Sequence, residues 1–539
     1  MNPFLATDGY KTGHHKMYPQ GTTLVYSNFT PRSNKYAPKG CDKVVSFGQQ
    51  MVMMQIQEMF DKYFFRIHLT ETWRKNQKHP QNTEYKRLLD IQKQDVCDEI
   101  KKEYSMYLGT DYDVSHIEAL WDLGYLPIKV KALPEGTLVP MGLPVLTIYN
   151  TLPEFYWLTN FLETLISNLL WKPMTSATIA YQYKQNLLSW VNKTDKENKG
   201  FVEFQGHDFS MRGMDSIDAT ISSGLGHATS FMGSDSLPVI HGARKYYGEK
   251  DFVVGSVNAT EHSVMCAGAK DSEIETFRYL MKQFPTGILS IVSDTWDLWK
   301  VITEYLPILK NEILARDGKI VIRPDSGDPV DIICGTNRHF EGTTLVGLGK
   351  INGLEEEPFH SEDMKGVIEL LWDIFGGTVN EQGYKVLDPH IGAIYGDSIT
   401  IDRAEQICAR LEAKGFASTN IVLGIGSFTY QFNTRDTFGF AMKATYVEVK
   451  TRTYDEDGRL CTKSIGREIF KDPVTDDGTK KSAKGLLHVG DFGDKGYILS
   501  DQVNWESEES GALNVIFEDG KFYNQVTLTE IREKLCYLD

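Results

Sequence analysis

Several apolar runs in the middle of the chain end abruptly in charged or small residues. The clearest lies at 320–329, and the same pattern recurs at 288–294, 391–397 and 421–426. Periodic segments typical of amphipathic helices follow at 296–305 and 401–411. Strands that alternate with helices predict a parallel sheet, whose ligands bind at the carboxyl ends of the strands. We therefore expect one common mouth formed by Ser290, Asp294, Arg323, Asp325, Gly396, Asp397 and Gly426.

The flanking segments have a different pattern. A helix is expected at 49–65, a charged segment occupies 75–102, and strand-like runs follow at 128–132 and 145–149. Further strand-like runs occur near the carboxyl end, at 440–450, 496–499 and 513–517. At 539 residues the chain is too long for one ordinary core. We predict an α/β protein with a central α/β barrel over 179–435 and an α+β domain built from both chain ends, 1–178 with 436–539.

Composition narrows the class of protein. Apolar residues make up 41% and aromatic residues 12% of the chain, which indicates a globular protein. The net charge of −16 argues against general nucleic-acid binding, because phosphate backbones require a basic surface. Seven scattered cysteines without a Cys-x-x-Cys pair favour a reducing compartment and no zinc site. No secretion signal is evident, and the apolar helix expected at 155–171 is interrupted by polar residues, so we expect no membrane span.

Three further motifs carry candidate chemistry. Phe209 and Arg212 lie three residues apart between glycines, where a ring could stack on a flat heterocycle beside a guanidinium that binds phosphate. The alternative is a core phenylalanine and an arginine paired outside it. His262 follows a glycine-containing strand end and suits phosphate binding or acid–base chemistry, although a lone histidine is more often structural. The lysines at 480–484 form either a solvated loop or local positive charge for an anionic ligand.

An ordered set of motifs resembles the nicotinamide phosphoribosyltransferase family, a group of type II phosphoribosyltransferases. The set comprises Leu5-Ala-Thr-Asp-Gly-Tyr-Lys11, His207-Asp-Phe-Ser-Met-Arg-Gly213, Glu261-His-Ser263, Ser293-Asp294, Ile322-Arg-Pro-Asp-Ser-Gly327, Gly396-Asp397, Thr434-Arg-Asp436 and Lys471-Asp-Pro473. Each motif is short, but together they occur in the family's order over nearly the whole chain. The resemblance implies the family's irregular α/β barrel and the transfer of phosphoribosyl from phosphoribosyl pyrophosphate to nicotinamide, with Mg²⁺, in NAD biosynthesis in the cytoplasm.

The resemblance also implies roles for single residues. Phe209 would stack on the pyridine ring, Tyr10 of a second subunit would cover its other face, and Asp235 would accept a hydrogen bond from the carboxamide. Arg323 would contact both the ring and the pyrophosphate. A homodimer follows, and Mg²⁺ would be held mainly by the substrate pyrophosphate. ATP would phosphorylate His262 and drive the transfer. The residues implied at phosphate, pyrophosphate and ribose are Arg212, His262, Ser290, Arg323, Asp325, Gly396, Asp397, Gly426, Ser427, Arg435, Lys471 and Lys480.

The chemistry of the residues agrees with this assignment. Transfer at an anomeric carbon passes through a positively charged state, which calls for carboxylates near the sugar and cations near the departing pyrophosphate. The residues assigned to catalysis are His262, Asp294, Arg323 and Asp325. Two features depart from the family: the turn Gly424-Ile-Gly-Ser-Phe428 has Ser and Phe in place of two glycines, and polar insertions occur near 332–363 and 451–467.

Three alternatives stay open. A nicotinate phosphoribosyltransferase shares the fold and the donor, and Asp235 is the residue that separates the two, because a carboxylate accepts from an amide but repels a second carboxylate. A non-enzymatic binding protein would keep the fold and lose charged positions. An unrelated Mg²⁺-dependent barrel lyase would share only the strand-end acids.

Overall fold

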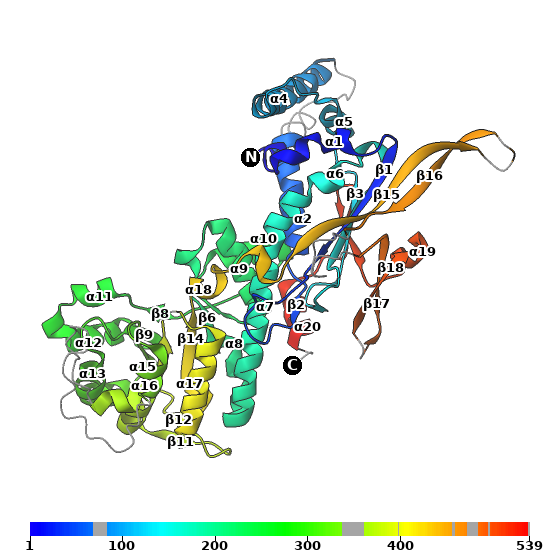
Figure 1. Ribbon diagram of the computed structural model, residues 1–539. Helices are drawn as coiled ribbons and strands as arrows, with labels where there is room; N and C mark the ends of the chain where they lie inside the picture. Colours follow the sequence, from blue (N-terminus) through cyan, green and yellow to red (C-terminus); the bar gives the residue numbers. More distant parts are fainter. Residues whose placement is uncertain are drawn as a thin grey trace, which may run out of the picture. The chain divides into compact units, whose positions relative to one another are not determined.

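The computed structural model describes residues 1–67, 83–336, 361–396, 398–454, 457, 459–471, 483–493 and 496–536, with only the backbone at 83–88 and 361–363. The chain forms two compact units, both discontinuous in sequence (Figure 1). The first comprises Met1–Thr178, Gly242–Glu249 and Asn433–Leu538, and the second comprises Ile179–His241 and Lys250–Phe432.

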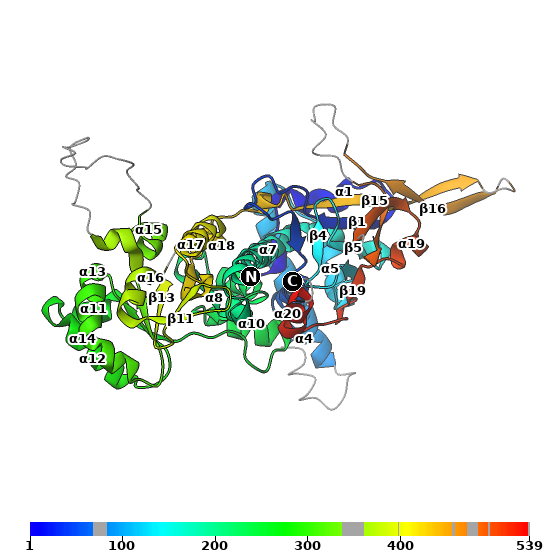
Figure 2. The same ribbon diagram turned by 90° about the horizontal axis from the view of Figure 1, so that it is seen from below.

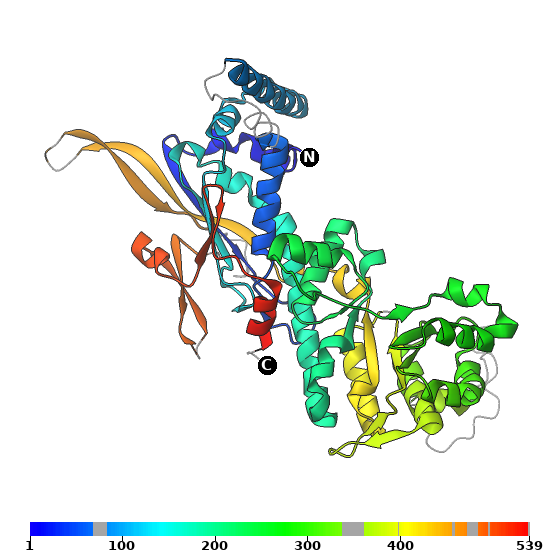
Figure 3. The same cartoon turned by 180° about the vertical axis from the view of Figure 1, so that it is seen from behind.

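The first unit is built on an antiparallel sheet that joins the two chain ends. Its strand order is β16 (Leu460–Glu468), β15 (Ala441–Tyr454), β1 (Thr22–Thr30), β5 (Leu146–Asn150), β3 (Ile128–Ala132), β19 (Asn514–Glu518) and β20 (Lys521–Phe522). At the centre, Phe29 pairs with Met442 on one side and with Leu146 on the other. Figure 3 shows these blue, cyan and orange strands side by side. The predicted α+β domain made from both chain ends is therefore confirmed.

Helices and a long hairpin complete this unit. Helix α2 (Gln49–Met59) continues as a π-helical turn (Phe60–Phe64), so the helix expected at 49–65 is present. Its residues Val52, Ile56 and Phe60 are buried at helical spacing, together with residues of the sheet such as Ile128 and Ile148. Strands β15 and β16 extend beyond the other strands of their sheet as a two-stranded arm (Figure 2).

The second unit contains a curled parallel sheet. The strand order is β7 (Gly233–Ser234), β6 (Gly206–Asp208), β14 (Ile421–Ile425), β13 (Ile391–Tyr395), β10 (Ile320–Arg323), β9 (Leu289–Val292) and β8 (Asn258–Ala259). A parallel bridge between Gly233 and Gly255 brings the two edges of the sheet together. The predicted α/β barrel is confirmed, in the form of this curled sheet.

Alternation along the strands separates the core from the interior of the curl. In β10, Ile320 and Ile322 are buried in the hydrophobic core, whereas Val321 and Arg323 line a cavity. The core-facing residues of helix α17 (Ile401–Ala413) recur at helical spacing, with Ala404, Ile407, Cys408 and Leu411 all buried. A strand that is apolar on one side and ends in a charged residue thus delivers Arg323 to the cavity.

The helix expected at 155–171 is divided in the structure: the short helix α6 (Leu158–Phe161) precedes a longer helix that extends beyond residue 171. Helix α7 (Glu163–Thr194) is 32 residues long and contains Pro173. The buried residues Leu170, Met174 and Ala177 of α7 keep helical spacing, so one face of the helix packs in the core. In the described parts of the chain, no helix is both long and apolar enough to cross a membrane.

Candidate active site

Polar residues of the second unit meet where the parallel strands end. Asp294, which follows β9, accepts hydrogen bonds through Oδ2 from the backbone N–H of Asp325 (2.7 Å) and from Ser326 Oγ (2.6 Å). Asp325 and Ser326 follow the neighbouring strand β10. Parallel neighbours end at one edge of the sheet, and this edge therefore brings two of the predicted carboxylates together.

Arg323, the last residue of β10, lies among three carboxylates. Its Nη2 donates to the backbone carbonyl of Thr260 (2.5 Å). Burial lowers the pKa of Arg323, while Asp325, Asp235 and Asp294 act in the opposite direction. Within the described residues, three buried polar atoms at this mouth have no hydrogen-bond partner: Ser290 Oγ, Asp294 Oδ1 and Arg323 Nε. Buried polar groups are normally satisfied, so these atoms are available to a ligand.

A cavity of about 530 Å³ opens inside the curl of the sheet. Most of its lining is apolar, from residues such as Val321, and its polar and aromatic lining residues include Phe209, Asp235, Ser290 and Arg323. Its size and its few polar groups match sites for small molecules. The Phe209 ring lies 4.6 Å from the His207 ring, at an angle of 37°. Phe209 lines the cavity, which is where a ring that stacks on a bound heterocycle has to lie.

Asp235 is held by two residues to which the sequence analysis assigns no role. His207 Nε2 lies 2.8 Å from Asp235 Oδ1, and the Ser256 hydroxyl donates to the same oxygen. Burial raises the pKa of Asp235, but these hydrogen bonds and the charge of Arg323 outweigh it and leave the pKa below its usual value. Asp235 is therefore ionised at neutral pH and acts only as a hydrogen-bond acceptor.

His262 begins helix α11 (His262–Ala267) beside the same carboxylates. Its Nδ1 lies 3.1 Å from Thr295 Oγ1, and its Nε2 lies 3.7 Å from Asp325 Oδ2. The imidazole is about half exposed, at 47% of its side-chain surface. An accessible histidine next to a carboxylate can donate a hydrogen bond, accept one, or act as a nucleophile.

Two glycines are required by close contacts at this mouth. A Cβ on Gly396 would lie 2.6 Å from Asp325 Oδ1, and a Cβ on Gly213 would lie 2.1 Å from Ser427 Oγ. Gly396 thus lets the Asp325 carboxylate approach the loop after β13. Gly213 belongs to the 3-10 turn Met211–Gly213, which carries Arg212. The close approach at Gly213 shows that this turn packs against Ser427. Asp397 lies outside the described residues.

The turn that departs from the family pattern lies at the end of β14. Gly426 precedes the short helix α18 (Ser427–Tyr430). Phe428 is 56% exposed, and its ring stacks on Phe432 at 5.1 Å. The bulky Phe428 side chain thus points to solvent and leaves the backbone of Gly426 and Ser427 beside the Arg212 turn.

The remaining predicted residues belong to the first unit. Tyr10 is 63% exposed, and the neighbouring Lys11 forms an ion pair with Glu163. Burial raises the pKa of Tyr10, and the nearby charge of Arg435 opposes this rise. Burial and the charges of Arg32, Lys471 and Arg435 lower the pKa of Lys443. An exposed tyrosine and a group of cations are therefore close together in this unit. Lys480 lies outside the described residues.

The sequence singles out neither Arg32 nor Lys443. Both are single basic residues in strand-like or loop segments, and they come together only because β1 pairs with β15. His207 and Ser256 stand within or beside recognisable motifs, but their contacts with Asp235 span 28 and 21 residues. Local pattern alone does not indicate such contacts.

The chain is similar to known proteins over nearly its whole length. Residues 204–506 match the nicotinate phosphoribosyltransferase (NAPRTase) family, and residues 2–86 match the N-terminal domain of nicotinamide phosphoribosyltransferase. A nicotinamide phosphoribosyltransferase of Acinetobacter baylyi is 46% identical, with 99% of this chain and 97% of the relative covered. A nicotinamide phosphoribosyltransferase of Mycoplasma pneumoniae is 32% identical, with 89% and 94% covered. The crystal structure of human nicotinic acid phosphoribosyltransferase has the same fold, with a TM-score of 0.52 and 15% identity over 99% of this chain and 93% of that one.

Proposed function

The chain belongs to the nicotinamide phosphoribosyltransferases, within the wider NAPRTase family of pentosyltransferases, and we propose that it converts nicotinamide and phosphoribosyl pyrophosphate into nicotinamide mononucleotide and pyrophosphate. The observation that carries the choice of nicotinamide is Asp235. An ionised carboxylate in the cavity beside Phe209 accepts a hydrogen bond from a carboxamide NH₂ and repels the carboxylate of nicotinate.

The geometry around Asp235 supports this role. His207 and Ser256 both contact Oδ1, whereas Oδ2 has no hydrogen bond or ion pair within the described part of the chain. One oxygen therefore fixes the side chain, and the other is available to the substrate. Phe209 supplies an aromatic surface for the pyridine ring in the same cavity.

The transfer needs no covalent intermediate with the protein. The pyridine nitrogen attacks C1 of the ribose, the bond from C1 to the pyrophosphate oxygen breaks, and pyrophosphate leaves with the bonding electron pair. Positive charge develops on the sugar, where Asp294 and Asp325 stabilise it. Negative charge develops on the leaving group, where Arg212, Arg323 and His262 lie at the same mouth. Asp325 is also placed to accept hydrogen bonds from the ribose hydroxyls.

Mg²⁺ fits this site as a partner of the substrate. Among the described residues, no three His, Cys, Asp or Glu side chains form a group that could hold a metal ion. The unpartnered Asp294 Oδ1 and the adjacent Asp325 are oxygen donors of the kind Mg²⁺ accepts, and Mg²⁺ commonly binds through one or two carboxylates plus substrate phosphates. When bound there, the ion neutralises charge on the pyrophosphate.

ATP coupling is assigned to His262. In this proposal an imidazole nitrogen attacks the γ-phosphorus of ATP, the bond between that phosphorus and the β,γ-bridging oxygen breaks, and ADP departs. Water later hydrolyses the phosphohistidine. The exposed imidazole, with Thr295 at Nδ1 and Asp325 near Nε2, has the access and orientation that this step needs.

A second copy of the chain completes the site in this proposal. Tyr10 would cover the open face of the nicotinamide ring, and Arg435, Lys471 and Lys480 would add positive charge near the phosphates. The support is the exposed Tyr10 ring and the cation group in the first unit, which holds Arg435 and Lys471. The enzyme would act as a homodimer in the cytoplasm, a reducing compartment in keeping with seven free cysteines.

The test is product formation from phosphoribosyl pyrophosphate and Mg²⁺ with nicotinamide or nicotinate in parallel. Both mononucleotide and pyrophosphate are measured, with and without ATP. Mononucleotide from nicotinamide alone is expected. Product from nicotinate alone would keep the reaction class and overturn the role of Asp235, and no product from either ring would favour a binding protein on the same fold.

A further inference from the structure

Two short loops of the mouth each lead directly into a helix. The loop that carries Asp325 ends at Asp328, whose carboxylate accepts from the backbone N–H groups of Val330 (3.0 Å) and Asp331 (3.1 Å) and so caps helix α15 (Pro329–Cys334). The loop that carries Gly396 ends at Thr400, whose hydroxyl caps α17. The orientations of α15 and α17 therefore set the positions of the two loops.

Two hydrogen bonds between described residues join the Asp325 loop to the end of β13 and to Gly396. The backbone N–H of Gly396 donates to Pro324 O (3.2 Å), and the Tyr395 hydroxyl donates to Gly327 O (2.9 Å). Helix α15 has only six residues, and a helix of this length is not stable without tertiary contacts. Its position therefore depends on tertiary contacts, which include the burial of Val330, Ile333 and Cys334 in the hydrophobic core.

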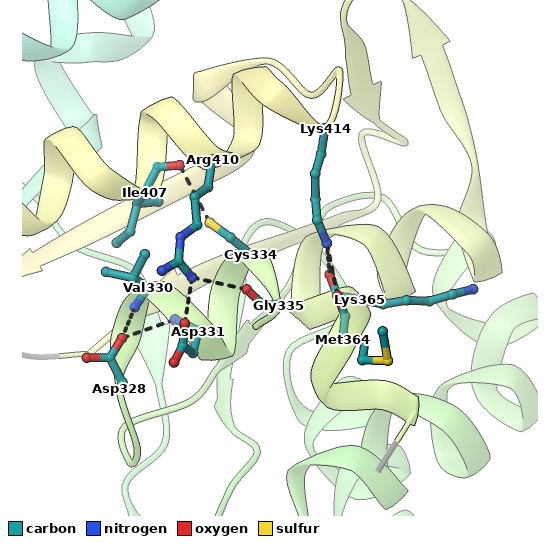
Figure 4. Close-up of polar contacts among 10 residues, drawn as sticks. All are labelled: Asp328, Val330, Asp331, Cys334, Gly335, Met364, Lys365, Ile407, Arg410 and Lys414. Atoms are coloured by element: carbon teal, nitrogen blue, oxygen red, sulfur yellow. Dashed lines mark hydrogen bonds and ion pairs between the residues drawn. The ribbon is translucent and has the colours of Figure 1, made fainter. Parts of the chain in front are cut away.

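Arg410 on α17 supplies a further contact behind the mouth. Its Nη1 donates to Asp331 Oδ1 (2.5 Å) and to the carbonyl of Gly335 (3.1 Å), at the end of α15 (Figure 4). The carbonyls at the end of a helix have no partner within it, so the guanidinium both pairs with the helix and caps it. The Cys334 thiol adds a contact to Ile407 O at 3.5 Å.

Helix α17 is also joined to helix α16 (Ser361–Phe375), through Lys414 at its carboxyl end. Lys414 Nζ donates to Met364 O (3.2 Å), Lys365 O (3.0 Å) and Glu369 Oε2 (2.8 Å), and Figure 4 shows it one turn beyond Arg410. A Cβ on Gly335 would lie 2.3 Å from Met364 O, so the end of α15 packs against the backbone of α16. Helix α15 thus packs between α16 and α17, and Arg410 joins it to α17 through the ion pair with Asp331.

We infer that Arg410 is a positioning residue for the phosphoribosyl donor, which it serves by holding α15 and α17 together and thereby fixing the Asp325 loop against the Gly396 loop. The inference rests on the proposed function for the identity of the donor. Within the described residues, the hydrogen bonds of Arg410 go to Asp331 and Gly335, which lie outside both loops. Its effect should therefore fall on the donor, which both loops contact, and spare the ring pocket at Phe209 and Asp235, which other strands build.

The test compares three variants of the full chain. Arg410→Ala removes both hydrogen bonds, and Arg410→Lys keeps the charge and can restore part of the contact. Arg278→Ala is the matched control, because Arg278 pairs with Glu275 and Glu312 elsewhere in the same unit. We expect Arg410→Ala to lower kcat/KM for phosphoribosyl pyrophosphate about tenfold, the loss typical of one charge-assisted hydrogen bond. The KM for nicotinamide should change less than about twofold, and Arg410→Lys should recover part of the loss.

A second readout does not depend on activity. Cys334 of α15 and Cys408 of α17 are buried free thiols. Cys334 contacts the carbonyl of Ile407 on α17, and its charge influences the pKa of Cys408, so the two thiols lie where the helices meet. Labelling with a thiol reagent, followed by mass spectrometry of these two cysteines, reports separation of the helices. Arg410→Ala should label faster than wild type at both, and Arg278→Ala should not.

The outcomes separate the inference from the proposed function. Wild-type activity with unchanged donor kinetics and unchanged labelling in Arg410→Ala would overturn the inference alone. An equal loss for donor and nicotinamide would also overturn it, because it would indicate general destabilisation. A wild-type protein that makes no mononucleotide would overturn the proposed function, and with it the role of Arg410 toward this donor.

Discussion

Replacement of Asp235 by Asn should relax the preference for nicotinamide, for a reason that lies in the two oxygens of the carboxylate. His207 and Ser256 both contact Oδ1. In Asp235→Asn the amide oxygen can keep both contacts, so the NH₂ group takes the place of Oδ2. A donor then faces the carboxamide NH₂ of nicotinamide, where an ionised acceptor stood before. The same donor suits the carboxylate of nicotinate.

The size of the change follows from the charges. Loss of a hydrogen bond to a charged group costs about 1.5–3 kcal/mol, or roughly 10- to 100-fold in kcat/KM for nicotinamide. Two like charges about 4 Å apart at an effective dielectric of about 20 repel by about 4 kcal/mol, and the variant relieves this repulsion for nicotinate. Even if solvent screens most of that repulsion, the ratio of kcat/KM for nicotinamide to that for nicotinate should fall by at least about 100-fold.

The assay is steady-state kinetics with each ring substrate at saturating phosphoribosyl pyrophosphate. Asp218→Asn, an exposed carboxylate in the first turn of helix α9 (Ile217–Ala228), is the control for the loss of one negative charge. An unchanged ratio in Asp235→Asn would refute the reasoning and place the discriminating contact elsewhere. An equal fall for both substrates would also refute it, because it would indicate damage to the cavity.

Three other changes test the mouth of the site, the coupling to ATP and the stability of the fold. Gly396→Ala places a Cβ 2.6 Å from Asp325 Oδ1 and should raise the KM for phosphoribosyl pyrophosphate at least about tenfold, whereas Gly200→Ala, in open space, should not; equal kinetics would show that the close approach is not needed. His262→Ala should abolish acid-labile labelling by [γ-³²P]ATP and the ATP stimulation of product yield, and full stimulation would contradict the coupling role. Burial raises the pKa of Glu135 from 4.5 to about 7, so this carboxyl ionises in the unfolded chain before it does in the folded protein, and the free energy of unfolding falls by up to about 3 kcal/mol as the pH rises from about 4.5 to 7. The thermal unfolding midpoint of Glu135→Gln should therefore fall less between pH 5 and 8 than that of wild type, and parallel curves would contradict this.

The strand ends that carry the site are predictable from sequence, because they depend on the local pattern of apolar and polar residues. Each of the strands β9, β10, β13 and β14 is an apolar run that ends in small or charged residues, and parallel pairing then brings these ends to one edge. This is why the sequence alone is sufficient to place Asp294 and Asp325 together. The fold class depends on the same alternation of strands and helices.

The supporting contacts are not predictable in this way, because they join residues far apart in the chain. The pair of His207 with Asp235 spans 28 residues, and the pair of Arg410 with Asp331 spans 79. Nothing in the local sequence of a histidine or an arginine indicates which carboxylate it will meet. The extent of α7 also escapes prediction, because the apolar run that indicates a helix ends near residue 171 whereas the helix continues to Thr194.

The decisive test of the proposed function is a structure of the protein with nicotinamide mononucleotide, pyrophosphate and Mg²⁺. We expect the pyridine ring on Phe209, the carboxamide within hydrogen-bonding distance of Asp235 Oδ2, the ribose hydroxyls at Asp325, and Tyr10 of a second copy over the ring. A ring bound elsewhere, or a carboxamide whose partners do not include Asp235, would contradict the proposal.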